Sequence, residues 1–208
     1  MSRQSRVTAL AMGVTLLVAC ATTTLTSTWQ APDAQAFSLS GKTIGVVFIT
    51  TEESLRRAGE NALAADLSSR GARAFGTYHL LPSGQQYDAQ QAQGRLMAAG
   101  ANAVVTMRVV GTDQRITYTP GTVITPTYRG FAPYWTNGWR TVYQPGTLRT
   151  DTLVSVETLV YSLPAEQSSQ LIWASTSRTT NPSGLDALAR DVADATASQM
   201  VRMGFLAR

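Results

Sequence analysis

Hydrophobic residues between positions 43 and 110 switch repeatedly between strand-like runs and helical spacing. The run 43–49 is continuous, branched and aromatic, as expected for a strand that is buried on both faces. Leucine and alanine then recur at three- and four-residue intervals, first over 55–67 and again between Asp88 and Gly100. Further strand-like runs follow these helical segments at 72–81 and 103–110. This order predicts right-handed crossovers and a three-strand, mostly parallel βαβαβ core.

The pattern changes in the last third of the chain. Residues 152–161 alternate between apolar and polar positions, which predicts a strand with one partly solvated face. A turn at 163–168 leads to 171–180 as its antiparallel partner, and 185–201 has the period of a final helix. The predicted fold class is therefore α/β, with a single domain over 37–208. An antiparallel β-hairpin extends the parallel core, and the C-terminal helix packs on the sheet.

The chain begins with a basic hexapeptide that is followed by a short apolar segment. Arg3 and Arg6 lie in the first six residues, and 7–19 is almost entirely apolar or small. This run is shorter than the roughly 20 residues that a membrane-spanning helix needs, so it predicts a lipoprotein signal peptide over 1–19. Leu17-Val18-Ala19-Cys20 matches the bacterial lipobox, in which the cysteine receives a diacylglycerol, becomes the N-terminus after cleavage and is then acylated.

Two alternatives to lipidation of Cys20 remain open. Ala19-Cys20-Ala21 also fits an ordinary signal peptidase site, with cleavage before Thr22 and loss of the cysteine, and Cys20 could simply be one small residue of the apolar run. The order of basic start, apolar run, lipobox and cysteine favours lipidation. Cys20 is also the only cysteine, so no disulfide framework exists and acylation would consume an otherwise free thiol. Ala21 in place of aspartate favours the outer membrane.

Residues 20–36 follow as the predicted lipidated cysteine and a flexible tether. The segment is rich in threonine, serine and alanine, contains Pro32 and has no hydrophobic period. Such composition is typical of a linker that lifts a domain away from a lipid surface.

Charge adds little to this picture. The formal net charge of the 208-residue chain is +4, and removal of Arg3 and Arg6 with the signal leaves 15 of the 17 basic residues against 13 acidic ones. Lys42 is the only lysine and the arginines are scattered, so no basic patch for nucleic acid is indicated. Arg56 and Glu60 are four residues apart on the polar side of the first predicted helix, where they can pair.

The residues needed for most enzymatic chemistry are missing. His79 is the only histidine, so with Cys20 lipidated no thiolate or imidazole metal cluster is available. No serine lies in a G-x-S-x-G elbow, and Gly41-Lys42-Thr43 precedes a strand instead of the helix that a phosphate loop requires. Asp151 and Glu157 lie on one strand about 20 Å apart, too far for a carboxylate pair. The sequence predicts a non-catalytic protein without a cofactor.

A long segment at about 118–146 is rich in proline, glycine and aromatic residues and has no regular period. Loops of this length are usually functional or disordered. Tyrosine, tryptophan and arginine are the residues that most often anchor interfaces, and the segment supplies Tyr128, Arg129, Tyr134, Trp135, Trp139, Arg140 and Tyr143. One hypothesis is docking of an envelope partner through this segment. The alternative is a binder of a small molecule or glycan with the segment as a lid. Packing of these aromatics on the protein's own sheet is also open.

Several short motifs lie along nearly the whole mature chain. They are Cys20, Ser27-Thr28-Trp29 with Pro32, the 42–49 strand, Arg56 and Glu60, Gly71, Leu80-Leu81-Pro82, Gly100-Ala101 with Ala103, Arg108, and Leu171-Ile172-Trp173 with Thr179 and Pro182. With these motifs the chain resembles a broad set of uncharacterised bacterial envelope lipoproteins. At fold level its strand–helix units look like the amino-terminal domain of TolB and the core of CsgG-type lipoproteins.

The resemblance implies a lipoprotein of the outer membrane that faces the periplasm, with a membrane contact through the lipid on Cys20. It also implies an accessory or interaction subunit of an envelope assembly, such as a transport or secretion complex. It supplies no catalytic residue, and neither the oligomeric state nor the partner follows from it.

Overall fold

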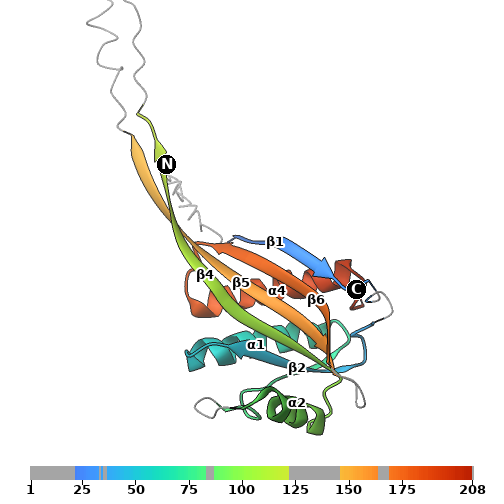
Figure 1. Cartoon of the computed structure of the whole chain (residues 1–208). Helices are drawn as coiled ribbons and strands as arrows, with labels where there is room; N and C mark the ends of the chain where they lie inside the picture. The colour runs from blue at the N-terminus through green and yellow to red at the C-terminus, as the bar shows by residue number, and fades with distance from the viewer. Residues whose placement is uncertain are drawn as a thin grey trace, which may run out of the picture.

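A six-stranded sheet in the order β1-β6-β5-β4-β2-β3 organises the protein (Figure 1). The structure is a computed structural model that describes residues 22–32, 34, 37–82, 87–121, 146–163 and 169–207. The predicted signal peptide and Cys20 therefore lie outside the described residues. The fold is mixed α/β, and no helix in the described ranges has the length and apolar character needed to cross a membrane.

The parallel part of the sheet is built by three strands. Strand β2 (Thr43–Ile49) pairs in parallel with β3 (Arg73–Gly76) on one side and with β4 (Ala103–Thr119) on the other. Helix α1 (Glu53–Ser69) connects β2 to β3, and α2 (Ala89–Ala98) connects β3 to β4. This half confirms the predicted alternation of strands and helices. Asp88, at the start of the predicted second helical segment, caps α2, since its side chain accepts from the Gln91 N–H at 2.7 Å.

The predicted strand 72–81 is much shorter in the structure. It ends at Gly76 because the chain turns at once: the carbonyl of Thr77 accepts hydrogen bonds from the backbone N–H groups of Leu80 and Leu81. His79 lies in this turn, with its ring 4.1 Å from that of Tyr78.

The other half of the sheet is antiparallel. Strand β5 (Thr147–Ser162) pairs with β4, and β6 (Gln170–Thr180) pairs with β5, which confirms the predicted hairpin. Strand β1 (Thr22–Gln30) then adds antiparallel to the outer side of β6. The predicted three-strand parallel core is present in β3, β2 and β4. The prediction falls short for the rest of the sheet, because every pair from β4 outward to β1 is antiparallel and β1 extends the sheet beyond the predicted hairpin.

Strand β1 also corrects the predicted tether. Residues 22–30 are not a linker but the edge of the sheet, and their pairing with β6 is continuous except for a bulge between Leu25 and Ser27. The threonines explain how a segment without hydrophobic period can form a strand. Threonine favours extended backbone, and the Thr23 and Thr179 hydroxyls hydrogen-bond across the pair at 2.7 Å.

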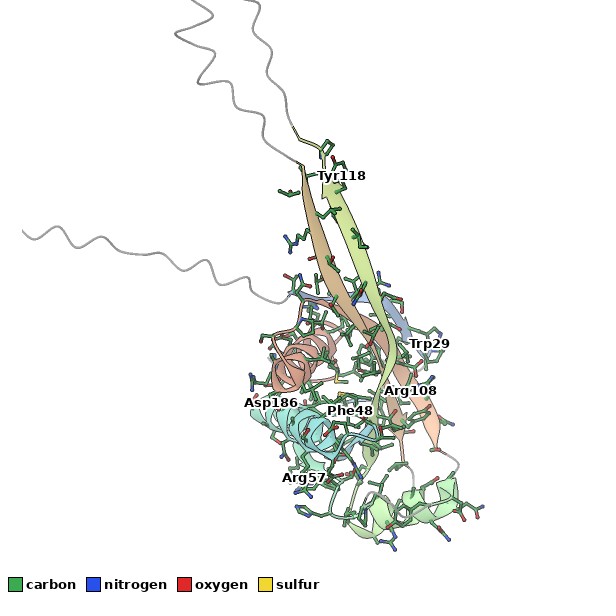
Figure 2. All side chains as sticks on the ribbon, turned by 90° about the vertical axis from the view of Figure 1, so that its left-hand side faces the viewer. Trp29, Phe48, Arg57, Arg108, Tyr118 and Asp186 are labelled. Atoms are coloured by element: carbon green, nitrogen blue, oxygen red, sulfur yellow. The ribbon has the colours of Figure 1, made fainter. Side chains whose placement is uncertain are left out.

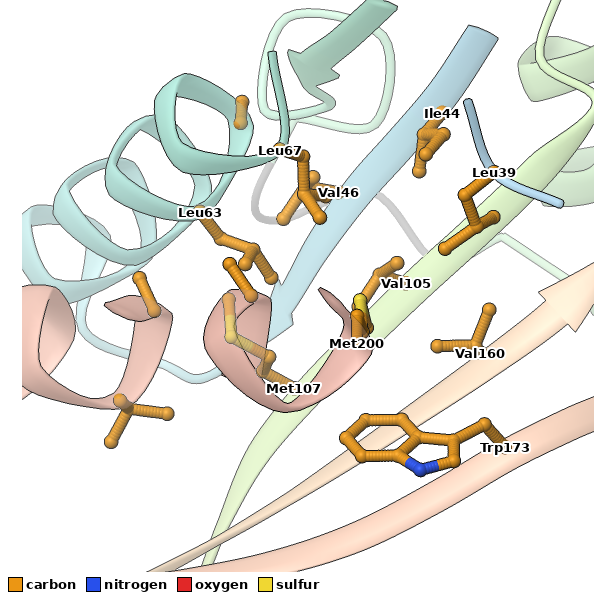
Figure 3. Close-up of a cluster of buried hydrophobic side chains, with 14 of the residues drawn as sticks. Leu39, Ile44, Val46, Leu63, Leu67, Val105, Met107, Val160, Trp173 and Met200 are labelled. Atoms are coloured by element: carbon orange, nitrogen blue, oxygen red, sulfur yellow. The ribbon is translucent and has the colours of Figure 1, made fainter. Parts of the chain in front are cut away.

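Helices α1 and α4 (Leu185–Arg202) cover one face of the sheet (Figure 1). The main core lies between these helices and the sheet (Figure 3). The core is filled by fully or almost fully buried side chains from every part of the chain, among them Leu39, Ile44, Val46, Leu63, Leu67, Val105, Val160, Trp173 and Met200. A smaller cluster of Leu96, Ala101, Val104 and Leu163 packs α2 on the opposite face. Alternating residues of β2 and β4 thus face two separate cores.

Helix α1 approaches β2 very closely at one position. A Cβ atom placed on Gly59 would overlap Cδ1 of Phe48, so only glycine allows the aromatic ring to pack against the helix here. The next residue, Glu60, also contacts β2 at Phe48.

Glu60 is fully buried, and Arg56 is 7% exposed. The predicted pair is confirmed, with Arg56 Nε donating to Glu60 Oε1 at 3.0 Å, but it lies in the interior and not on a polar face. The backbone N–H of Phe48 in β2 donates to the same oxygen at 3.1 Å. Those of Thr77 and Tyr78, just after β3, donate to Oε2 at 2.6 and 2.8 Å. One carboxylate therefore joins α1 to two neighbouring strands.

Replacing Glu60 with alanine should strongly destabilise the fold. It removes an acceptor from three backbone N–H groups, of which only that of Thr77 also donates to the Val46 carbonyl. It also leaves the Arg56 guanidinium buried without its carboxylate, so we expect the free energy of unfolding to fall by about 3–5 kcal/mol. Chemical denaturation would measure it. Glu53→Ala is the matched control, because Glu53 pairs with Arg57 in the same helix where the Arg57 and Glu53 side chains are 57% and 40% exposed, and it should change stability by less than about 1 kcal/mol. Equal losses in both variants would contradict the assigned role of Glu60.

Candidate interaction surface

Strands β4 and β5 continue beyond the rest of the sheet as a two-stranded ribbon (Figure 2). We define the ribbon as residues 114–119 and 147–152, whose six pairs run from Gln114–Thr152 to Thr119–Thr147. The pairing of β2 with β4 ends at Arg108, and the pairing of β6 with β5 ends at Leu153. The described residues therefore place no third strand on either edge of the ribbon.

The two faces of the ribbon differ in chemistry. Directly paired residues lie on the same face, and successive residues alternate between faces. One face carries no charge and consists of Gln114, Ile116, Tyr118, Leu148, Thr150 and Thr152. Its large apolar side chains are open to solvent, with Ile116 68%, Tyr118 62% and Leu148 72% exposed. The other face carries Arg115, Thr117, Thr119, Thr147, Arg149 and Asp151. The ribbon is therefore amphipathic.

Asn181 braces the root of the ribbon. Its backbone N–H donates to the carbonyl of Thr152 at 2.8 Å, and its side-chain oxygen accepts from the Thr152 N–H at 2.8 Å. Its amide nitrogen also donates to Asp151 Oδ1 at 2.6 Å. Asn181 adopts φ 50°, a left-handed conformation that asparagine tolerates better than most residues. A single residue after β6 thus continues the ladder by one step.

Asp151 is held as a charged acceptor by its neighbours. The hydrogen bond from Asn181, together with that from Arg149 Nε at 2.7 Å, lowers the pKa of the Asp151 carboxyl below its ordinary value. On the charged face, Asp151 is therefore ionised at neutral pH and forms an ion pair with Arg149. The uncharged face has no charged side chain, and its large apolar side chains are exposed.

The predicted contact residues cannot be placed directly. Tyr128, Arg129, Tyr134, Trp135, Trp139, Arg140 and Tyr143 lie outside the described residues, as does Cys20. What the structure places are the ends of their segment: Gly121 follows β4 and Gly146 precedes β5, both at the outer end of the ribbon. Sequence reasoning missed the ribbon itself, although polar and apolar residues alternate over 115–118, a signal typical of a strand.

A second surface feature is an open groove between β1 and α4. It has a volume of about 720 Å³ and is lined mainly by polar side chains, among them Thr23, Thr28, Asp194, Gln199 and Arg202. Arg70 of the turn after α1 donates to Asp194 at 3.3 Å. In the described part of the chain, no group of three histidine, cysteine, aspartate or glutamate side chains is placed to hold a metal ion.

Comparison with known proteins gives distant structural neighbours. No protein-family model matches the chain, and no curated protein matches it significantly. Among solved structures, a PelC dodecamer from Paraburkholderia phytofirmans is 14% identical, with coverage of 86% of this chain and 97% of that one, at a TM-score of 0.44. Lipoprotein GNA1162 from Neisseria meningitidis is also 14% identical, with coverage of 77% and 99%, at a TM-score of 0.41. The resemblance to TolB and CsgG-type lipoproteins stays a prediction.

Asn181→Gly should loosen the root of the ribbon without unfolding the domain. Glycine keeps the left-handed backbone and removes only the side-chain bonds to Thr152 and Asp151. We expect faster amide hydrogen exchange at Thr152 and along the ribbon, with protection of β2 unchanged. The lowered pKa of Asp151 means that its contacts are complete above the ordinary pKa and are lost as the pH falls through the lowered value.

NMR titration should therefore show the pKa of Asp151 rising in the Asn181→Gly variant. Ser183→Gly, two residues further along in an exposed position, serves as the control and should alter neither exchange nor titration. Unchanged exchange at Thr152 in the Asn181 variant would show that the brace is dispensable.

Proposed function

We propose that this protein is a non-catalytic component of the bacterial envelope. A lipid on Cys20 anchors it to the outer membrane on the periplasmic side, and it contacts a partner of an envelope assembly through the 118–146 segment. The observation that carries the proposal is the ribbon, because it holds both ends of that segment away from the folded body. Six residue pairs of antiparallel strand extend about 20 Å.

The build of the ribbon supports an interaction role. A two-stranded ribbon is only marginally stable in water unless its face packs against something. The uncharged face of this ribbon packs against nothing in the described structure and exposes three large apolar side chains. Exposed apolar residues that gather on one face mark interaction sites. A projection of this kind adds nothing to the core, so it is best explained by contacts outside the domain.

The lipid anchor is tested by the mass of the mature N-terminal peptide. We expect a diacylglyceryl-modified and N-acylated Cys20 as the first residue, since three acyl chains are enough for stable membrane attachment. Cys20→Ser should abolish the modification and shift the protein out of the membrane fraction. An unmodified peptide that starts at Thr22 would refute the anchor.

The partner contact is tested by photocrosslinking in cells. A photoreactive residue at Trp139 should capture one specific envelope protein, whereas the same probe at Arg190, an exposed position on α4, should not. Mass spectrometry would identify the captured protein. Capture of the same protein from both positions, or only self-crosslinks from Trp139, would count against docking through this segment.

The groove between β1 and α4 favours a second candidate function, the binding of a small polar molecule or glycan. Its threonine, glutamine and arginine side chains offer hydrogen bonds of the kind that sugars use, although it is open and not enclosed. A rise in melting temperature with added glycans, lost in Gln199→Ala, would support this candidate.

A further inference from the structure

The strand register fixes where the chain enters the domain relative to the ribbon. Thr22, the first residue of β1, is opposite Thr180 of β6, which is in turn opposite Leu153 of β5. Leu153 is the residue from which the ribbon leaves the sheet. Because β1 and β5 are both antiparallel to β6, they run in the same direction, and the start of β1 points toward the outer end of the ribbon.

Cys20 precedes Thr22 by two residues, so its Cα lies within about 7 Å of the start of the strand. Two strand spacings, about 10 Å, separate Thr22 from the root of the ribbon. The ribbon then continues for about 20 Å beyond that level. A membrane that holds acyl chains on Cys20 therefore lies on the same side of the domain as the ribbon, within its reach.

We infer that the outer end of the ribbon rests in the headgroup region of this membrane, with Ile116, Tyr118 and Leu148 turned toward the lipid. This inference rests on the proposed lipidation of Cys20. The predicted tether would have allowed any orientation, but β1 leaves almost no free chain between the anchor and the sheet. The occupant of the uncharged face is thus the lipid surface.

Hydrogen bonding decides between insertion and surface contact. Both edges of the ribbon expose backbone N–H and C=O groups, which find no partners in hydrocarbon. The ribbon therefore lies along the surface and does not enter the hydrocarbon core. Tyrosine suits this position because its ring is apolar and its hydroxyl can bond water or headgroups.

Charge attraction is not what holds the ribbon there. Arg115 and Arg149 are balanced by Asp113 and Asp151 at the ribbon and its root, so no net positive charge draws it to anionic lipid. The contact should form equally on zwitterionic vesicles and persist in high salt.

The experiment uses the full mature lipoprotein in phosphatidylcholine vesicles. Because Cys20 is the only cysteine and its sulfur would be acylated, one introduced cysteine provides a unique thiol for an environment-sensitive fluorophore. Leu148→Cys places the label on the uncharged face, and Thr117→Cys places it on the opposite face at almost the same level. Arg57→Cys on α1 reports the body of the domain. We expect lipids with a nitroxide on the headgroup to quench the label at position 148 several-fold more strongly than they quench the labels at positions 117 and 57.

Vesicle flotation separates the possible failures. Protein that does not float overturns both the anchor and the ribbon placement. Floating protein whose label at 148 is quenched no more than that at 117 overturns the ribbon placement alone. A blue shift at 148 without nitroxide quenching would place protein, such as a second copy, on this face and would also overturn the inference.

Discussion

The buried carboxylate of Glu60 is the interaction on which the arrangement of helices and sheet depends. A carboxylate in a protein interior is tolerated only when its oxygens are fully hydrogen-bonded and its charge is paired. Here Arg56 comes from the same helix, whereas the backbone donors belong to the end of β2 and the turn after β3. A sliding or rotation of α1 would break several of these bonds at once. Because α4 packs beside α1, the position of α1 on the sheet also fixes the position of α4.

Sequence periodicity predicted the segments whose hydrophobic contrast is strong. The β2 strand was predicted with its observed bounds, and the final helix was confirmed. It failed at β1, an edge strand that is mostly exposed and rich in small polar side chains. Six of the nine residues of β1 are threonine or serine, and none of the nine is fully buried. A hydropathy pattern cannot separate such a strand from a linker, because threonine occupies both faces.

The candidate surface could be predicted only in part. The lipobox and the aromatic segment are chemical signals in the sequence itself, and both concern residues outside the described structure. The amphipathic ribbon has an alternating pattern that predicts strands, but the pattern does not say that β2 and β6 end before them. Similarly, the spacing of Arg56 and Glu60 predicted an ion pair. The burial of this pair depends on contacts with the end of β2 and with the turn after β3, which the spacing within one helix does not predict.

The position of β1 has a consequence for how the chain folds. Its paired residues in β6 are all more than 140 positions away along the chain, and Thr23 and Thr179 are 156 apart. A chain made from its N-terminus must therefore keep its first strand unpaired until almost all of the sequence has emerged. Contacts of such long range form late and slow folding. During this interval β1 is an uncharged strand with two free edges, which makes it the segment most prone to mispairing with another chain.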